Sequence, residues 1–287
     1  MGVRILCDSA SDLSEDLLKE YSIDRLSLMV IKGEEEYFDG LTISSKEVYD
    51  GMKDGEIFKT SQVPPSSFEK KFEEYAKNQD SVIYLAFSSE LSGTHQAAVF
   101  VKEQIKEQYP EFDLTIIDTK SASIGLGLIV LEAGRLAKEG KSKEEILKTV
   151  EFYLDHIQHV FTVDNLEYLF RGGRVSKTQA LVGGLLNIKP ILNMEDGKLV
   201  PLDKVRGKSK VYKALLDLMD KRTKGADLTT QIIGISHADD LENALKLKEM
   251  ISERFAVKDF VIGDIGATIG AHVGPGTLAL FFMSKTK

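Results

Sequence analysis

The sequence predicts an α/β fold with two α/β domains, an N-terminal one around a parallel, Rossmann-like sheet and a C-terminal one around a mixed sheet. Short apolar runs alternate with amphipathic stretches along the chain, which is typical of strands and the helices that cover them. The length of 287 residues favours two domains over one. The second half also contains a hairpin signal, which favours a sheet that is not purely parallel.

In the N-terminal half, the apolar run VRILCD predicts a buried first strand at residues 3–8. A helix over 13–21 follows, and we expect Asp12 to cap it, with Glu15 three residues later as in a capping box. Residues 23–31 alternate in polarity and predict a second strand. The next elements are expected to be an acidic loop at 33–44, helix 66–77, strand 81–88, helix 93–109, strand 114–119 and helices 123–138 and 143–157. Buried strands that alternate with helices predict a parallel sheet covered on both faces.

We place the domain boundary so that residues 1–157 form the first domain and residues 158–287 the second. A β-hairpin is predicted over 191–202, where Asp196 and Gly197 separate two strand-like runs. The other expected elements are strand 159–163, a short helix in 165–174 that ends at Gly172–Gly173, helix 177–186, helix 208–223, strand 231–236, helix 240–254, strand 259–265 and strand 277–283.

Charge and composition exclude several classes of protein. The chain has 37 Lys and Arg against 45 Asp and Glu, a formal net charge of −8, which argues against a protein that coats nucleic acid. The single cysteine, Cys7, excludes a disulfide framework and a cysteine-based zinc site. The apolar windows at 124–131 and 276–283 are far shorter than the about 20 residues of a membrane-spanning helix. We therefore expect a cytoplasmic protein without a membrane span.

Three motifs of common enzyme or metal sites are incomplete or missing. The segment GRLAKEGKS at 134–142 resembles a phosphate-binding loop, but its glycines are too far apart and it lies where a helix ends. His156 and His159 are three residues apart, but no nearby carboxylate or cysteine set completes a metal site, so no metal is predicted. The chain has no G-x-S-x-G motif, which disfavours an α/β-hydrolase.

Three polar clusters remain as candidates for a site. The first is Thr60–Gln62, before a predicted helix, and the second is Ser88–Thr94, between a strand end and a helix start. The third is a glycine-rich turn at 270–276 that contains His272. Ligands of parallel sheets bind outside the carboxyl ends of strands, where a helix N-terminus favours an anion, and Gly93 lets the backbone come close. The alternative for each cluster is a structural role that needs no ligand: a serine can cap a helix, and a histidine can be buried and hydrogen-bonded in the core.

Three arginines provide local positive charge in this acidic sequence: Arg171, Arg174 and Arg206. Guanidinium groups suit a phosphate or an acidic partner. The alternative for each is that it satisfies carbonyl groups at a helix end.

Taken together, these motifs resemble the DegV family over nearly the whole chain. The matching pieces are CDSASDL (7–13), TSQ (60–62), SSELSGT (88–94), DTKSASIGLG (118–127), NLEYLFRGGRVS (165–176), KVRGK (204–208) and AHVGPG (271–276). The resemblance implies a lipid-binding protein that buries a long acyl chain between its two domains. In bacterial relatives such a protein is the fatty-acid-binding subunit of a fatty acid kinase, in phospholipid metabolism. A separate kinase subunit makes the acyl phosphate, so the resemblance implies no catalysis by this chain itself.

The resemblance also assigns roles to single residues. It implies that the carboxylate is bound by Thr60 and the adjacent Ser61, by Ser92 and the adjacent Gly93, and by His272. It places Arg206 at the encounter with the kinase, and we group Arg171 and Arg174 with it as contacts to the partner or the phosphoryl group. The expected ligand is a fatty acid of about C14 to C18, such as palmitate, with no other cofactor; a transient contact with a membrane surface is compatible with this role.

Two further positions bear on that assignment. Val63 departs from the family pattern, because many members have proline at this position. Asp8 and Ser9 match a family signature and are expected to shape the loop at the end of the first strand.

Elementary energetics agree with a fatty acid as ligand. Each buried methylene gains about 0.8 kcal/mol, whereas the carboxylate must keep hydrogen bonds when it leaves water. Hydroxyl groups and an imidazole supply these bonds without a fixed buried cation. One alternative is a lipid hydrolase or acyltransferase with Ser92 as nucleophile, His272 as base and Asp264 as the nearest candidate acid. Another is a nucleotide or phospho-sugar binder, for which the sequence lacks a complete phosphate motif.

Overall fold

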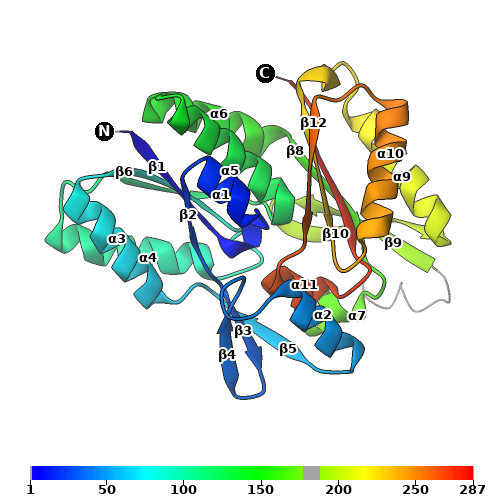
Figure 1. Cartoon of the computed structure of the whole chain (residues 1–287), viewed down its shortest axis with the longest axis horizontal. Helices are drawn as coiled ribbons and strands as arrows, with labels where there is room; N and C mark the ends of the chain where they lie inside the picture. Colours follow the sequence, from blue (N-terminus) through cyan, green and yellow to red (C-terminus); the bar gives the residue numbers. More distant parts are fainter. Residues whose placement is uncertain (1, 177–187, 287) are drawn as a thin grey trace.

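Residues 2–176 and 188–286 are described in the computed structural model of the chain, and Figure 1 shows their arrangement. The first sheet is parallel, in the order β2-β1-β6-β7. Its strands are β1 (Val3–Asp8), β2 (Ile23–Leu26), β6 (Ser81–Ala86) and β7 (Leu114–Asp118). The helices of this half are α1 (Glu15–Glu20), α3 (Pro65–Asn78), α4 (Thr94–Gln108), α5 (Ser123–Lys138) and α6 (Lys143–His156), and the 3-10 helix η1 (Ser9–Ser11) follows β1.

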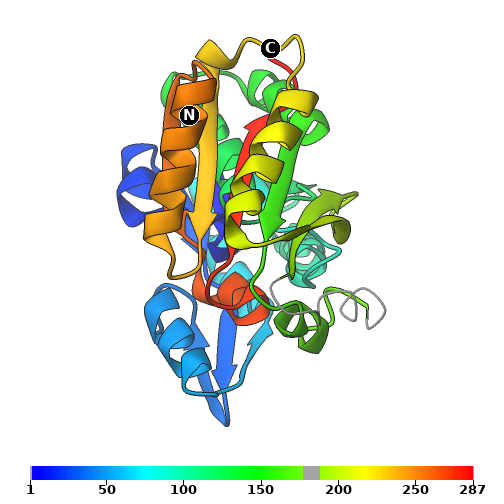
Figure 2. The same cartoon turned by 90° about the vertical axis from the view of Figure 1, so that its right-hand side faces the viewer.

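The C-terminal half has a six-stranded mixed sheet. Its strands are β8 (Ile157–Thr162), β9 (Ile188–Glu195), β10 (Lys198–Arg206), β11 (Ile232–His237), β12 (Asp259–Asp264) and β13 (Leu278–Met283), in the order β10-β9-β8-β13-β11-β12. The pair β11–β12 is parallel and the other pairs are antiparallel. Its helices are α7 (Glu167–Arg171), α9 (Lys208–Arg222), α10 (Leu241–Arg254) and α11 (Ala267–Val273), with the 3-10 helix η2 (Leu228–Thr230). Figure 2 shows α9 and α10 side by side in front of this sheet. The parallel N-terminal sheet and the mixed C-terminal sheet are as predicted.

A third, small antiparallel sheet comprises β3 (Met29–Lys32), β4 (Glu35–Phe38) and β5 (Phe58–Ser61), in the order β4-β3-β5. Together with α2 (Ser45–Lys53) it extends below the two large sheets in Figure 1. Both α2 and this sheet contact α11, an element of the C-terminal half. The division at 157/158 stays a prediction, although β8 begins at Ile157.

Helix α5 lies between the two large sheets, because it contacts β1 on one side and β8, β11, β12 and β13 on the other. Residues 123–131 are therefore all buried, which explains the apolar window in the sequence. Glycines permit this close packing: a Cβ on Gly125 would lie 2.3 Å from Nε2 of His159, and one on Gly127 would lie 2.7 Å from the Ser11 carbonyl oxygen. None of the helices in the described residues is long and apolar enough to cross a membrane.

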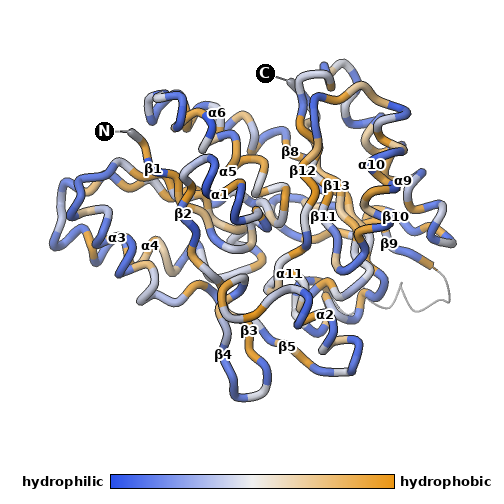
Figure 3. Tube along the Cα trace, viewed as in Figure 1, coloured by the Kyte–Doolittle hydropathy of each residue, from blue (hydrophilic) through white to orange (hydrophobic). Residues whose placement is uncertain are grey.

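The buried apolar residues of ranges 2–176 and 188–286 form three clusters. One fills the N-terminal half, one lies under α9 and α10, and one lies where α5, α11 and the small sheet meet the inner face of the mixed sheet. Figure 3 shows hydrophobic residues concentrated along the strands of both large sheets. Strand β13 separates the last two clusters, because Leu278, Leu280 and Phe282 face the helices while Ala279 and Phe281 face inward.

Three predictions near the N-terminus were wrong. The predicted strand 23–31 is two strands, β2 in the first sheet and β3 in the small sheet, and the loop predicted at 33–44 contains β4. No glycine or proline separates the two strands, so the sequence carries no strong signal for the change of partner. Helix α1 is capped by Ser14, whose side chain accepts from the Leu17 N–H, and not by Asp12, which has a φ of 52°.

Three elements near the candidate clusters were not predicted. Thr60 and Ser61 lie in strand β5 rather than in a loop, and α2 precedes that strand. His272 lies on α11 rather than in a glycine-rich turn. The strand and α11 are short and depend on packing against distant segments, whereas α2 carries a local signal that was missed, the capping box of Ser44 and Glu47. The helix predicted at 177–186 lies outside the described residues.

Candidate functional site

A cavity of about 290 Å³ lies between the two halves of the chain. Its floor is the inner face of the mixed sheet, where Ala279 and Phe281 of β13 are paired with Phe161 and His159 of β8. The N-terminal half contributes both apolar side chains, such as Phe87 and Leu91, and polar ones, such as Thr60 and Ser92. A mostly apolar, partly enclosed cavity of this kind is typical of a small-molecule site.

One part of the wall is polar, and it contains the predicted carboxylate-binding residues. The five residues Thr60, Ser61, Ser92, Gly93 and His272 all line this cavity. They come from three separate elements: the end of β5, the loop before α4, and α11. The fold therefore brings together residues that are more than 200 positions apart in the chain.

Thr60 and His272 form the central polar contact of this wall. Oγ1 of Thr60 lies 2.6 Å from Nε2 of His272, so the two groups share a hydrogen bond. Nδ1 of His272 is buried and has no hydrogen-bond partner among the described residues. Burial, and next the charge of Arg174, lower the pKa of His272 to about 4, so its imidazole is neutral at pH 7.

The Ser92–Gly93 turn approaches β5 closely. Oγ of Ser92 lies 2.8 Å from Oγ1 of Thr94, which also accepts the N–H of Val63 at 3.3 Å. Proline could not make that last bond, so the valine at position 63 gives this chain a link between β5 and α4. A Cβ on Gly93 would lie 2.3 Å from Oε1 of Gln62, so a larger residue there would have to displace the end of the Gln62 side chain.

Arg174 fixes the loop on the other side of His272. Its Nε and Nη2 both donate to the Leu91 carbonyl, at 3.0 and 2.7 Å, and its Nη1 donates to the carbonyl of Gly172. Gly172 and Gly173 end α7 as predicted, and Gly173 has the positive φ of 74° that such a helix end requires. Arg174 thus satisfies backbone carbonyls and still lines the cavity.

A second, outer cavity shares Thr60, Arg174 and His272 with the first. It is also lined by Arg171, whose guanidinium carbon lies 4.9 Å from the ring centre of Tyr168. The Thr60–His272 pair therefore forms part of the wall between an apolar cavity and an outer one with arginine side chains. Arg206, the last residue of β10, is exposed and lines neither cavity.

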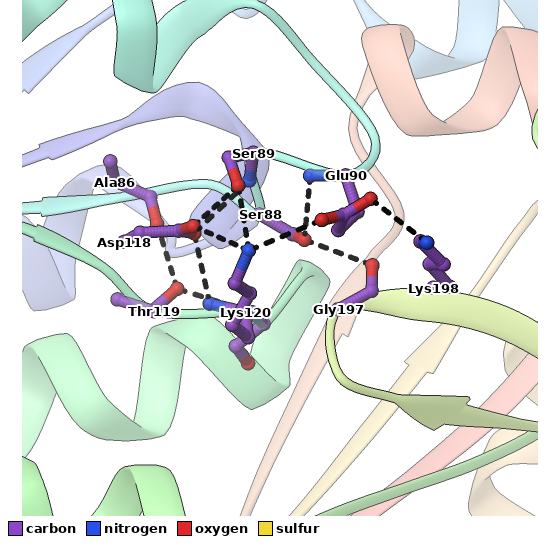
Figure 4. Close-up of polar contacts among 10 residues, drawn as sticks. Ala86, Ser88, Ser89, Glu90, Asp118, Thr119, Lys120, Gly197 and Lys198 are labelled. Carbon is purple, nitrogen blue, oxygen red and sulfur yellow. Dashed lines mark hydrogen bonds and ion pairs between the residues drawn. The ribbon is translucent and has the colours of Figure 1, made fainter.

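The remaining serines of the second cluster have a structural role. Ser88 is buried and donates from its Oγ to the carbonyl of Gly197, 2.9 Å away, in the turn of the β9–β10 hairpin. Figure 4 shows this contact beside the ion pairs of Lys120 with Asp118 and of Lys198 with Glu90. Ser88 thus holds the two halves together and does not line the cavity.

Asp8 is completely buried at the end of β1 and does not line the cavity either. Its carboxylate accepts from the Tyr84 hydroxyl at 2.8 Å and from the N–H groups of Phe87 and Ala10. Burial is the largest influence on its pKa, which is raised to about 6. Ser9 donates to Asp39. Both residues therefore organise the loops at the end of the first sheet.

The geometry does not complete a hydrolytic triad. Asp264, the acid that the sequence favoured, lies 3.4 Å from Nδ1 of His237 and not beside His272. No carboxylate in the described part of the chain bonds to His272, and no group of three or more potential metal ligands occurs there. The orienting group that a Ser–His nucleophile needs is thus missing among these residues.

Sequence reasoning missed the apolar lining of the cavity. The alternation of side chains in β13, with Ala279 and Phe281 on the inner face, was a signal that could have identified part of it. His159 also lines the cavity; its Nε2 lies 2.7 Å from Oγ of Ser121, and burial lowers its pKa to about 3. The sequence singled out His159 only as a possible metal ligand beside His156, and gave no sign that it lines a cavity.

The fold and the site define an α/β protein of two large sheets that share α5, with a mostly apolar cavity between the two halves and a polar wall on part of it. A model of the DegV family, described as uncharacterised proteins, matches residues 2–285. A DegV domain-containing protein of Clostridium perfringens is 42% identical over 286 residues, which is 99% of this chain and 98% of that protein. The chain belongs to the DegV family.

Two solved structures are similar over nearly their whole length. A DegV family protein of Thermus thermophilus, described as fatty acid binding, has 29% identity and a TM-score of 0.90, with 99% of both chains covered. A stearic acid-binding protein of Eubacterium ventriosum has 26% identity and a TM-score of 0.91, with 98% of both chains covered. The fold is therefore that of DegV proteins.

Proposed function

We propose that this protein binds a long-chain fatty acid of about C14 to C18, with its tail in the inner cavity and its carboxylate at the Thr60–His272 pair. The observation that carries this proposal is the pair itself, an uncharged hydroxyl–imidazole contact of 2.6 Å at the polar end of an apolar cavity. The fatty-acid-binding relatives support the same ligand class.

The hydrogen bonds of the pair suggest how the head group is held. With its proton on Nε2, His272 donates to Oγ1 of Thr60, and the Thr60 hydroxyl is free to donate to the carboxylate. The unpartnered Nδ1 is then an acceptor and leaves no buried N–H unsatisfied. Ser92 supplies a second hydroxyl, with Ser61 and the Gly93 backbone beside it. The neutral donors compensate the lost hydration of the carboxylate, and the tail gains about 0.8 kcal/mol per buried methylene.

We further propose that the protein has no catalysis of its own and presents the carboxylate to the catalytic subunit of a fatty acid kinase. A carboxylate oxygen attacks the γ-phosphorus of ATP, ADP leaves, and an acyl phosphate forms. Arg171 and Arg174 in the outer cavity suit the added phosphoryl group, and exposed Arg206 suits the partner. The free, buried Cys7 suits the reducing cytoplasm that we propose as the location.

Mass spectrometry of the gently purified protein under native conditions tests the ligand. We expect a co-purified fatty acid and, after its removal, saturable binding of palmitate. Ser92→Ala removes a hydroxyl donor to the carboxylate, and His272→Ala removes the bond that orients the Thr60 hydroxyl. Each should weaken palmitate binding about tenfold. The exposed Ser252→Ala, on α10, is the matched control. Absence of any fatty acid binding would reject the proposal, and unchanged affinity in both variants would reject the site.

Reconstitution with a kinase catalytic subunit tests the proposed presentation of the carboxylate to a partner. The protein, palmitate, ATP and a fatty acid kinase catalytic subunit together should yield acyl phosphate, detected as a hydroxamate after hydroxylamine treatment. The protein alone should neither form acyl phosphate nor cleave a p-nitrophenyl ester. Ester cleavage that disappears in Ser92→Ala would instead favour the hydrolase.

A further inference from the structure

We propose that Asp39 is a positioning residue of this site, which holds the helix carrying His272 against the sheet carrying Thr60. The inference rests on the proposed fatty acid binding and adds a residue that touches neither the cavity nor the ligand. Asp39 follows β4 and is almost completely buried, with 3% of its surface exposed.

The carboxylate of Asp39 caps α11, although the two lie far apart in the sequence. Its Oδ1 accepts the N–H of Ala267 at 3.0 Å, and its Oδ2 accepts the N–H of Thr268 at 3.2 Å. A carboxylate at this position satisfies N–H groups that have no partner within the helix and faces the positive end of its dipole. Because α11 has only 7 residues, this cap supplies a large share of the bonds that hold it.

The backbone of Asp39 belongs to the other side of the site. Its N–H donates to the carbonyl of Leu28 at 2.9 Å, and its own carbonyl accepts the Ser27 hydroxyl at 2.8 Å. Leu28 directly precedes β3, in which Val30 is paired with Thr60. Asp39 is thus fixed at the base of the small sheet, and its carboxylate reaches across to α11.

Other side chains of the N-terminal half hold the turn that precedes α11. Oδ1 of Asp12 accepts the N–H of Gly266 at 2.9 Å, and the Tyr49 hydroxyl donates to the Ile265 carbonyl at 2.6 Å. Neither bond reaches the first two N–H groups of the helix itself, which Asp39 alone accepts among the described residues. The 2.6 Å contact between Thr60 and His272 therefore depends on where Asp39 places the start of α11.

The test compares two ligands in Asp39→Asn. Asparagine keeps the size of the side chain but replaces one acceptor oxygen with an NH₂ group, so it can cap only one of the two N–H groups. We expect palmitate to bind about tenfold more weakly, because the carboxylate contacts depend on the Thr60–His272 geometry. Methyl palmitate, which lacks the charged head, should change less than about twofold, because the apolar lining is intact. Both affinities are measured by calorimetric titration of delipidated protein, with exposed Asp54→Asn as the control.

A double-mutant cycle separates positioning from a general loss of structure. In a Thr60→Val background, Asp39→Asn should cause little further loss of palmitate affinity, because the contact it positions is already absent. An equal loss for palmitate and methyl palmitate, a full additional loss in the Thr60→Val background, or an unchanged affinity for palmitate would each overturn the inference.

A variant that fails to fold and a failure of the proposed function can each be told apart from a failure of the role of Asp39. If Asp39→Asn does not fold, Ala267→Pro replaces it, since proline is accepted at the first position of a helix and removes the N–H that Asp39 binds; the same selective loss is expected. If the unaltered protein binds neither ligand, the proposed function fails. If the unaltered protein and Asp39→Asn bind palmitate with equal affinity, only the role of Asp39 is refuted and the proposed function stands.

Discussion

The orientation of His272 depends on the small size of Gly172. A Cβ at Gly172 would lie 2.0 Å from Nδ1 and 2.8 Å from Cε1 of the imidazole, far inside van der Waals contact. Gly172 has helical backbone angles that any residue adopts, with a φ of −72°, so room for the ring and not backbone freedom explains this glycine. The neighbouring Gly173 is different, because its φ is positive.

Gly172→Ala should therefore displace the imidazole from Thr60, leave the Thr60 hydroxyl unoriented, and weaken palmitate binding about tenfold. Titration with palmitate and the free energy of unfolding in urea check this prediction together. Gly263→Ala in β12 is the matched control, because the nearest atoms to its Cβ lie at 3.5 Å. Normal binding in Gly172→Ala would show that the ring tolerates the methyl group and that its position is less restricted than we infer.

At the scale of elements, the β9–β10 hairpin closes one side of the cavity. Met194 and Leu199 are a cross-strand pair, and both line the cavity. The hairpin turn is held to the N-terminal half by the bond from Ser88 to the Gly197 carbonyl and by the more distant ion pair of Lys198 with Glu90, at 3.5 Å. The buried hydrogen bond matters more, because a partly exposed ion pair contributes little.

Ser88→Ala should lower the free energy of unfolding by about 1–2 kcal/mol, because it leaves the Gly197 carbonyl without its partner. Chemical denaturation of delipidated protein measures this loss. Lys198→Ala is the comparison, for which we expect less than about 1 kcal/mol. If the two variants lose equal stability, the hairpin is not held chiefly by Ser88.

At the scale of the whole molecule, the cavity exists because the two large sheets share α5 and leave their facing surfaces incompletely filled. His159 lies in this shared interior, 5% exposed, with its Nε2 bonded to Ser121. Burial lowers its pKa to about 3, below the ordinary value of about 6.5. As the pH falls below 6.5, the unfolded chain therefore takes up a proton here that the folded protein does not.

His159 therefore lowers the free energy of unfolding as the pH falls from about 6.5 towards 3. His159→Gln removes that titration, so between pH 7.5 and 5 it should lose about 2 kcal/mol less than the unaltered protein. Urea unfolding at the two pH values gives the comparison. An identical loss in both proteins would mean that His159 is protonated in the folded state at pH 5.

Much of the fold followed from local pattern. The strands β1, β6 and β7 and the helices α1, α3 and α4 were predicted because buried apolar runs alternate with amphipathic ones. The candidate residues Thr60, Ser92 and His272 also came from sequence motifs, with the DegV resemblance giving them roles. The break between β2 and β3 was not predictable, because no glycine or proline marks it in residues 23–31.

The sequence by itself determined the fold class, the absence of a disulfide framework and the identities of the polar residues, since all three depend on residue type and spacing. Tertiary structure alone decided that Thr60 meets His272, that Arg174 binds the Leu91 carbonyl, and that Asp39 caps α11. Each of these contacts joins segments separated by tens to hundreds of residues, and no local periodicity encodes which distant groups will meet. They form because a buried donor or acceptor must find a partner, and packing of the two sheets around α5 determines which partner is within reach.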